Sequence, residues 1–167
     1  LPYSSSMANI HDEKVESAAE SARVLLQAIE RDLKPRDIIT RESIENAVAV
    51  VMAVGGSTNA VIHLAAIAGR LGLRLDMALL DELGRRIPLL VDLKPSGQHY
   101  MEHFHDAGGV PRLLAELRDE LALDAPTVYG GSIGDAIDAA PETPGQTVIR
   151  SLATPLQTTG TLAVLGG

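Results

Sequence analysis

The first apolar pattern in the chain is a long helical one. Between Asp12 and Leu33, apolar side chains recur every three or four positions, which is the spacing of one face of an α-helix. Glu13 and Glu16 suit the positive end of the helix dipole, and Pro35 indicates the end of the helix because the residue before a proline disfavours the α region. The predicted apolar face consists of Val15, Ala18, Ala19, Ala22, Leu25, Leu26, Ile29 and Leu33.

Two further helices are predicted on either side of a glycine pair. Thr40 has the chemistry of an N-cap for the first of them, and the pair at 55–56 ends it. The second begins near Ser57 or Thr58. Almost every position in 60–68 is apolar, so we expect this helix to be surrounded on most sides. The inner face of the first helix is predicted to be Ile44, Ala47, Val48 and Val51.

The second half of the chain alternates short helical patterns with extended ones. The run at 87–93, Ile-Pro-Leu-Leu-Val-Asp-Leu, is typical of a strand that is buried on both faces, and a turn follows at 94–97. The tail at 147–167 predicts two short β segments joined by a loop. Helices are predicted over 77–86, 100–106, 110–121 and 133–139. The expected fold class is therefore α/β and helix-rich, with few short strands.

Composition narrows the classes of function. Hydrophobic residues make up 46% of the 167 positions and aromatic residues only 2%, so we expect a core of Ala, Val, Leu and Ile. The net charge of −8 argues against nucleic acid as a partner, because phosphate backbones need a basic face. No apolar run is long enough to span a membrane, so no membrane partner is expected. The absence of cysteine excludes disulfides and thiolate ligands within the chain, and a cytoplasmic setting is expected.

The sequence Gly-Gly-Ser-Thr-Asn at the start of the third helix is the first candidate site. Gly55 and Gly56 allow a tight bend and a close approach of the backbone to a ligand. The helix N-terminus offers unpaired N–H groups, and Ser57, Thr58 and Asn59 add hydroxyl and amide groups. Such a site suits a carboxylate or a polyhydroxyl group. The alternative is that these residues only cap the two helices.

Three more residues complete the set of substrate-binding or pocket-shaping candidates. His63 lies one helical turn after Asn59, with the alternative that it is a hydrogen-bonded core histidine. Lys94 and Ser96 stand in the turn at 94–97, where they suit an anionic substrate or serve the turn alone. The residues form no arrangement of nucleophile, base and acid, so no catalytic residue is expected in this chain.

A cluster of histidines raises the question of a metal site. His99, His103 and His105, with Asp106, could act as ligands, because imidazoles four positions apart share a helix face. However, His103 and His105 point in different directions on a helix, and the spacing is not that of the zinc motif His-Glu-x-x-His. The favoured interpretation is a half-exposed helix, with no metal held by these residues.

Three segments in order resemble the dihydroxy-acid/sugar-acid dehydratase family. They are ITRESIENAVAVVMAVGGSTNAVIHLAAIAGRLGL at 39–73, IPLLVDLKPSGQHYMEHFHDAGGVPRLLAEL at 87–117 and TVYGGSIGDAI at 127–137. The family includes phosphogluconate and aldonic (sugar) acid dehydratases. The resemblance implies a hydro-lyase that converts a 2,3-dihydroxy acid, either a dihydroxy acid of amino-acid biosynthesis or an aldonic sugar acid, into a 2-keto acid.

The resemblance also implies a position for the chain within a longer protein. Residues 1–150 would be the later part of an N-terminal α/β (αβα) iron–sulfur domain, and 151–167 a linker and first strand of a C-terminal β-barrel-like domain. Family members use an iron–sulfur cluster and Mg²⁺, whose ligands, like the serine proposed as base, would lie outside these residues. A small-molecule hydroxy acid is the implied partner, and a homo-oligomer, dimer or tetramer, the implied state. Both ends of the chain look cut, since it begins without Met and stops inside an apolar run.

Two other interpretations stay open at this point. The chain could be a non-catalytic carboxylate-binding or assembly module that shares the helical scaffold. It could also be a complete small metal-dependent enzyme that uses His99, His103 and His105. If the dehydratase interpretation is right, the segment alone should be inactive and should expose apolar surface that normally meets missing parts of the protein.

Overall fold

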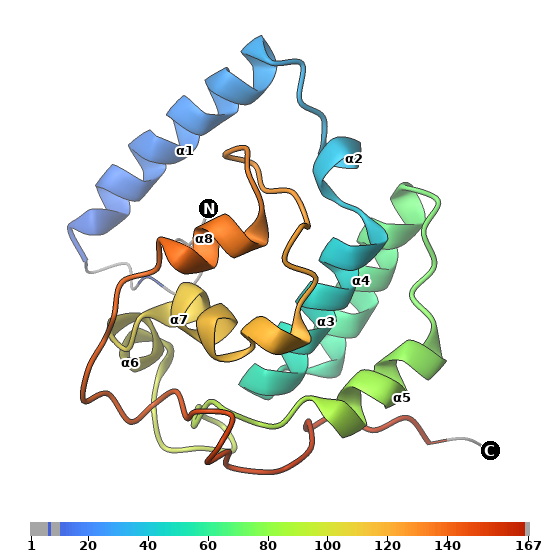
Figure 1. The fold of residues 1–167 in the computed structure, drawn as a ribbon, viewed down its shortest axis with the longest axis vertical. Helices are drawn as coiled ribbons and strands as arrows, with labels where there is room; N and C mark the ends of the chain where they lie inside the picture. The colour runs from blue at the N-terminus through green and yellow to red at the C-terminus, as the bar shows by residue number, and fades with distance from the viewer. Residues whose placement is uncertain (1–6, 8–10, 166–167) are drawn as a thin grey trace.

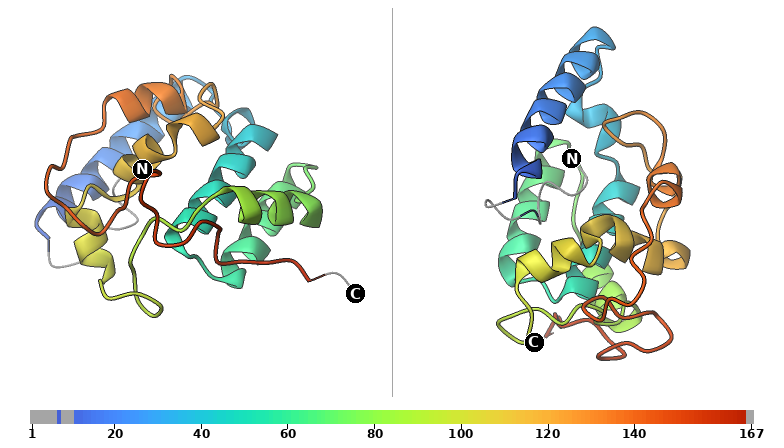
Figure 2. Two further views of the ribbon diagram at one scale, coloured as in Figure 1. Left: turned by 60° about the horizontal axis from the view of Figure 1, so that its bottom comes forward. Right: turned by 90° about the vertical axis from the view of Figure 1, so that its left-hand side faces the viewer.

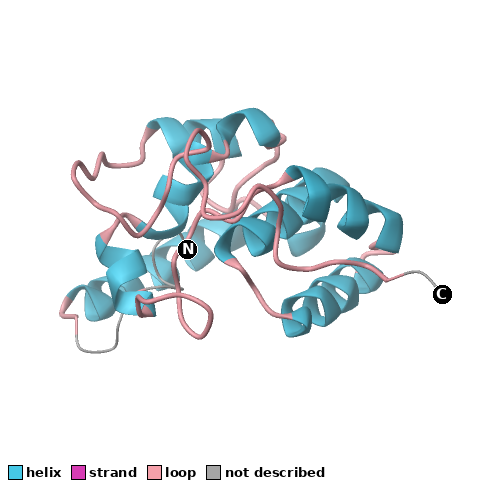
Figure 3. Cartoon of the chain, turned by 90° about the horizontal axis from the view of Figure 1, so that it is seen from below, coloured by secondary structure: helices cyan, strands magenta, loops and turns pink. Residues whose placement is uncertain are grey.

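Helices supply nearly all of the regular structure. The computed structural model describes Met7 and residues 11–165, and within these it contains eight α-helices, one short 3₁₀ helix and no β-ladder longer than an isolated bridge (Figures 1 and 3). The α-helices are α1 (Glu13–Glu30), α2 (Pro35–Ile38), α3 (Arg41–Val54), α4 (Thr58–Arg70), α5 (Met77–Arg86), α6 (Met101–Asp106), α7 (Gly109–Glu116) and α8 (Ile133–Asp138). The helix-rich part of the expected fold class is confirmed.

Local capping chemistry sets most helix boundaries. Thr40 accepts a hydrogen bond from the backbone N–H of Ser43, so it caps α3 as predicted. The Ser43 hydroxyl also accepts one from the backbone N–H of Thr40, which makes the cap reciprocal. The expected helix at 110–121 is shorter, because α7 gives way to the 3₁₀ helix Arg118–Glu120. The single turn of α2 was not predicted.

The core forms around α3, α5 and the extended segment 87–93. α3 packs against both α4 and α5, while α7 packs against α6 and α8. Segment 87–93 runs between these groups (Figure 1), and its Ile87 and Leu90 have no exposed surface. Phe104 of α6 and Leu113 of α7 are buried in the same apolar cluster.

The prediction of a strand at 87–93 is wrong, although the segment is buried as expected. On one side, the N–H groups of Leu90 and Val91 donate to the carbonyl of Ala53 at the end of α3, at 2.9 and 3.2 Å. Pro88 has no N–H to donate. Because a helix end takes the hydrogen bonds that a neighbouring strand would take, no regular ladder forms.

The two β segments predicted in the tail are also absent from its described part. The bridges between the tail and segment 87–93 are isolated and antiparallel, Val91 with Ile149 and Leu89 with Gln157. Further along, the N–H of Gly160 donates to the carbonyl of Gly84 in α5 at 2.8 Å. The described part of the tail therefore contacts the core without forming regular secondary structure.

Burial of α1 and α4 differs most from expectation. In α4 only Ala68 is buried, so the prediction of a surrounded helix is wrong. α1 runs along one edge of the molecule (Figures 1 and 2) and buries only Val24 and Ala28. Four large apolar side chains on α1, here called the α1 apolar stripe, stay exposed by 61–76%: Val15, Leu25, Leu26 and Ile29.

Candidate functional site

The glycine pair forms a tight joint between α3 and α4. Gly55 adopts the left-handed conformation (φ 77°), and the N–H groups of Gly55 and Gly56 donate to the carbonyls of Met52 and Val51. This pair of bonds is a Schellman motif, which ends helices at glycine because other residues are strained there. A Cβ on Gly56 would stand 2.9 Å from the Val51 side chain, so the second glycine is required by space.

The polar residues after the glycines are exposed at the start of α4. Ser57 occupies the N-cap position, but its side chain makes no capping hydrogen bond there. Thr58 and Asn59 are also exposed, and α4 continues for 13 residues behind them. The capping alternative therefore accounts for the glycines but not for the Ser57 hydroxyl. The helix start presents N–H groups, hydroxyls and an amide to solvent, which together suit an anionic oxygen ligand.

His63 lies on an exposed surface of α4. The alternative of a hydrogen-bonded core histidine is therefore wrong. Its position one turn after Asn59 keeps it on the same side of the helix as the polar start.

Lys94 and Ser96 belong to a compact loop before α6. Lys94 donates from Nζ to the Tyr100 hydroxyl at 2.6 Å, with its ammonium 3.9 Å from the centre of the same ring. The Ser96 hydroxyl donates to the Leu93 carbonyl at 3.4 Å, as expected of a residue that serves the turn. The Lys94–Pro95 peptide bond is cis.

Segment 87–93 is the structural link between these two groups of candidates. The side chain of Leu89 lies 3.1 Å from the position that a Cβ on Gly55 would occupy, and Lys94 directly follows the segment. Within the described part of the chain, no hydrogen bond or ion pair joins Lys94 or Ser96 to residues 57–63. The structure thus places both groups next to the same buried segment without bringing their polar atoms into contact.

The second glycine-then-hydroxyl sequence, Tyr-Gly-Gly-Ser at 129–132, is a capping structure. The Ser132 side chain accepts from the N–H of Asp135, and the Asp135 carboxylate accepts from the backbone N–H of Ser132 at 2.7 Å and from its hydroxyl at 2.9 Å. These two hydrogen bonds, the backbone one first, hold the pKa of Asp135 below its ordinary value. The sequence is therefore explained by α8 alone.

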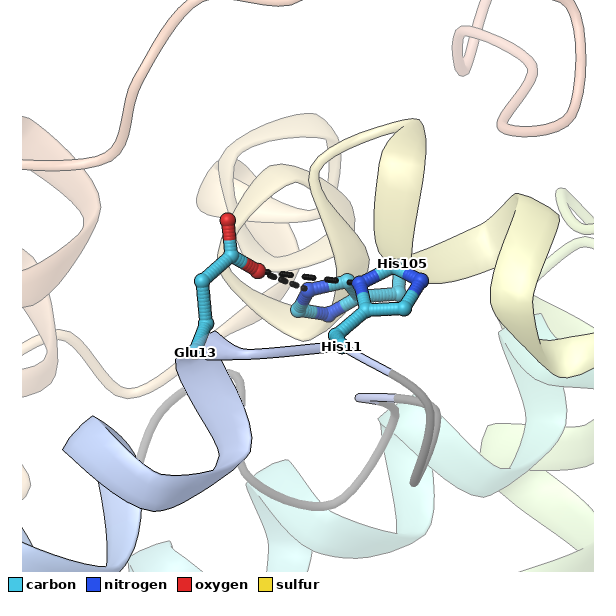
Figure 4. A group of neighbouring side chains, drawn as sticks. All are labelled: His11, Glu13 and His105. Atoms are coloured by element: carbon cyan, nitrogen blue, oxygen red, sulfur yellow. Dashed lines mark ion pairs between the residues drawn. The ribbon is translucent and has the colours of Figure 1, made fainter.

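The histidines do not gather as the sequence pattern proposed. His99 and His103 face each other edge to face, with ring centres 5.5 Å apart, and the Nδ1 of His103 accepts the backbone N–H of Tyr100. His105 instead points toward the start of α1 (Figure 4), where His11 and Glu13 meet it. Among the described residues, this is the only group of three potential metal ligands. Sequence reasoning missed it because His105 is far along the chain from the other two.

These residues do not fit the cofactors that the family resemblance implies. An iron–sulfur cluster is held by cysteine thiolates in nearly all cases, and the chain has no cysteine. Mg²⁺ prefers oxygen ligands, whereas two of the three clustered groups are imidazoles. Neither cofactor is therefore assigned to side chains of this segment.

None of the helices in the described part of the chain has the length and apolar character needed to cross a membrane.

Comparison with known proteins gives a consistent result over the whole chain. A sequence model for the family described as "Dihydroxy-acid/6-phosphogluconate dehydratase N-terminal" matches residues 1–136. Proteins named dihydroxy-acid dehydratase from Polaromonas naphthalenivorans (strain CJ2) and Herminiimonas arsenicoxydans are each 48% identical over 171 residues. A protein named dihydroxy-acid dehydratase 1 from Aromatoleum aromaticum is also 48% identical. All three alignments cover 100% of this chain but only 30–31% of the relative, so the chain spans about a third of the length of these curated relatives.

Proposed function

This chain belongs to the dihydroxy-acid/6-phosphogluconate dehydratase family, and we propose that it is a segment of a hydro-lyase that converts a 2,3-dihydroxy acid into a 2-keto acid. The observation that carries the proposal is the identity of 48% along the full chain to proteins named dihydroxy-acid dehydratase. In such a reaction the C3 hydroxyl and the C2 proton leave as water, and the resulting enol tautomerises to the keto acid. The three relatives named above favour a dihydroxy acid over an aldonic sugar acid as substrate.

We place the segment in the later part of an N-terminal α/β iron–sulfur domain, with residues 151–167 leading toward a second domain. The family model described as N-terminal, which matches residues 1–136, supports this placement. The iron–sulfur cluster and Mg²⁺ would be held by other parts of the complete protein. The segment alone is then inactive.

Within that protein, the start of α4 is proposed to bind the carboxylate or hydroxyl groups of the substrate. Exposed N–H groups at a helix N-terminus attract anions, and the free Ser57 hydroxyl and the Asn59 amide add donors beside them. Gly55 and Gly56 hold this start close to the buried centre. His63 is proposed to shape the same pocket from the next turn. Lys94, which is hydrogen-bonded to Tyr100, is proposed to contribute positive charge from the loop before α6.

A homo-oligomer, dimer or tetramer, is proposed for the complete protein. The support is the α1 apolar stripe, whose exposed side chains would lose contact with water at an interface between copies or between domains.

Substitution of Asn59 by Asp tests the role of the helix start. The new carboxylate favours the positive end of the helix dipole, so folding is not weakened, but it repels an anionic substrate. We expect the KM of the complete enzyme for its hydroxy acid to rise about tenfold or more, with a much smaller change in kcat. Steady-state kinetics measure both values.

The matched control is Gln27→Glu, which adds the same charge to an exposed position on α1. It should leave KM and kcat unchanged. An unchanged KM in Asn59→Asp would remove the start of α4 from the substrate site, without affecting the assignment to the family.

The catalytic proposal itself is tested on the protein as its source cell makes it. We expect an intact mass well above 17.6 kDa, bound iron and release of a 2-keto acid from a dihydroxy acid. A protein of 17.6 kDa that binds carboxylates without turnover would establish the alternative, a non-catalytic binding or assembly module.

A further inference from the structure

We infer that His11, Glu13 and His105 form a binding site for a divalent transition-metal ion of the zinc class, which clamps the start of α1 to α6. The site is independent of the dehydratase proposal, because none of its three ligands belongs to the start of α4 or to the loop at 94–97. It departs from the sequence-based expectation that no metal is held by this chain.

The three side chains converge on one point, at separations somewhat longer than those around a bound ion. One oxygen of Glu13, Oε2, lies 3.6 Å from Nδ1 of His11 and 3.8 Å from Nε2 of His105 (Figure 4). The three ligand atoms all lie within 4.8 Å of one another. Zinc binds nitrogen and oxygen at about 2.0–2.1 Å, which places tetrahedral ligands about 3.4 Å apart. A small inward movement of each side chain would therefore complete the coordination.

The two contacts to Glu13 are ion-pair contacts rather than short hydrogen bonds. Hydrogen bonds from nitrogen to oxygen usually measure about 2.7–3.2 Å, and both contacts to Glu13 are longer. The rings of His11 and His105 stand edge to face, with centres 5.5 Å apart, so they converge on the carboxylate from two directions. This convergence leaves an ion able to contact all three groups at once.

The chemistry of the ligands selects the class of metal. Two imidazoles and one carboxylate are a common ligand set for Zn²⁺ and related ions, with a fourth position left for water. Mg²⁺ and Ca²⁺ prefer sites composed of oxygen atoms. His105 is 11% exposed and His11 25%, while Glu13 is 64% exposed, so an ion could enter from the Glu13 side.

The site would anchor a helix that the core holds weakly. α1 buries only two of its residues. Its far end is attached by Arg31, whose guanidinium donates to the carbonyls of Val128 and Tyr129, each at 3.3 Å. A metal at the near end would connect the start of α1 to α6, across a long separation in sequence, and fix the helix at both ends.

The experiment follows the first two turns of α1 by hydrogen–deuterium exchange in the complete protein, washed with chelator and then titrated with Zn²⁺ alone. We expect Zn²⁺ to slow exchange in the peptide that contains these turns. In His105→Gln the protection should require at least about tenfold more Zn²⁺, because loss of a metal ligand weakens binding by no less than loss of its supporting contacts does. Metal sites elsewhere in the protein do not affect this readout, since it is confined to α1.

The matched control is His103→Gln, which removes an imidazole two positions away on the same helix. It should leave the response of α1 to Zn²⁺ unchanged. Because His105 is largely buried, Glu13→Gln serves as a second variant, whose exposed side chain can change without disturbing the fold. No protection of α1 by Zn²⁺ in the unaltered protein would overturn the inference. Equal loss in His103→Gln and His105→Gln, or full protection in both His105→Gln and Glu13→Gln, would overturn it as well.

Discussion

At the scale of single residues, Asn46 connects two parts of the fold that sequence patterns treat separately. It is the only buried polar residue within the described part of the chain, with 7% of its surface exposed. Its amide nitrogen donates to the carbonyl of Ala122 at 3.0 Å, and its amide oxygen accepts the N–H of Ala122 at 2.8 Å. One side chain thus satisfies both backbone groups of a loop residue that follows the 3₁₀ helix.

Substitution of Asn46 by Ala should lower the free energy of unfolding by about 1–3 kcal/mol, because it leaves the N–H and C=O of Ala122 without partners in a partly buried place. The matched control is Gln27→Ala, an amide truncated at an exposed helix position, which should change stability by less than about 0.5 kcal/mol. Urea unfolding of both variants measures the difference. Equal effects would show that the contact to Ala122 contributes little.

Residue roles could be predicted from sequence only where their partners lie nearby in the chain. Thr40 and the glycine pair acted as caps because their hydrogen bonds close within one helical turn. Asn46 and Ala122 stand 76 positions apart, and no local pattern connects them. The contact of His11 and Glu13 with His105 could not be predicted for the same reason, because His105 is distant in sequence from both. His103, the histidine nearest to His105 in sequence, contacts His99 instead.

At the scale of elements, the contact between α5 and the tail depends on the absence of side chains. Gly84 is buried in α5, and a Cβ there would stand 2.7 Å from the backbone carbonyl of Leu162. The carbonyl of Gly84 also accepts the N–H of Gly160. Because the atom that a new Cβ would meet belongs to the backbone, a change of side-chain rotamer cannot relieve the clash. The helix and the tail can therefore approach only at glycine.

Replacement of Gly84 by Ala should destabilise the protein by about 1–3 kcal/mol through overpacking, although alanine is the better helix former. Gly69→Ala is the matched control, because Gly69 lies in α4 with no atom within 4 Å of a new Cβ. That variant should gain about 0.5–1 kcal/mol. Thermal unfolding of the two variants should give shifts of opposite sign; a stabilising Gly84→Ala would contradict the close approach of the tail.

Element boundaries followed the sequence more closely than element environments did. Helical spacing and caps are local, so α1, α3, α4, α5 and α6 begin and end within a few residues of the predicted positions. Whether 87–93 becomes a strand depends on which backbone lies beside it, and here the end of α3 takes that place. The prediction that α4 is buried was wrong for a related reason. An apolar sequence indicates that a helix can be buried, but it does not indicate which part of the protein packs against it.

At the scale of the whole molecule, α1 and α4 both expose large apolar side chains to solvent. Val15, Leu26 and Ile29 lie on one face of α1, and Leu25 borders them. On α4, Ile62 and Ile67 are exposed by 66% and 44%. The expectation that this segment exposes apolar surface is met by these residues, in a chain that spans about a third of the length of its relatives.

The isolated 167-residue chain should therefore self-associate at micromolar concentrations, which sedimentation velocity would detect. Leu26→Lys places a charge in the α1 apolar stripe and should weaken self-association several-fold. Gln27→Lys adds the same charge at the adjacent, more polar position of α1 and should not. A clean monomer of the unaltered chain would show that the exposed side chains do not drive association.

The segment 87–93 has a consequence for synthesis on the ribosome. Its Leu89 and Asp92 N–H groups and its Leu90 carbonyl are bonded to backbone groups between Val148 and Thr159. Helices α3, α4 and α5 leave the exit tunnel well before those partners are translated. The buried segment therefore cannot complete its backbone hydrogen bonds during synthesis until residues 148–159 have also left the ribosome.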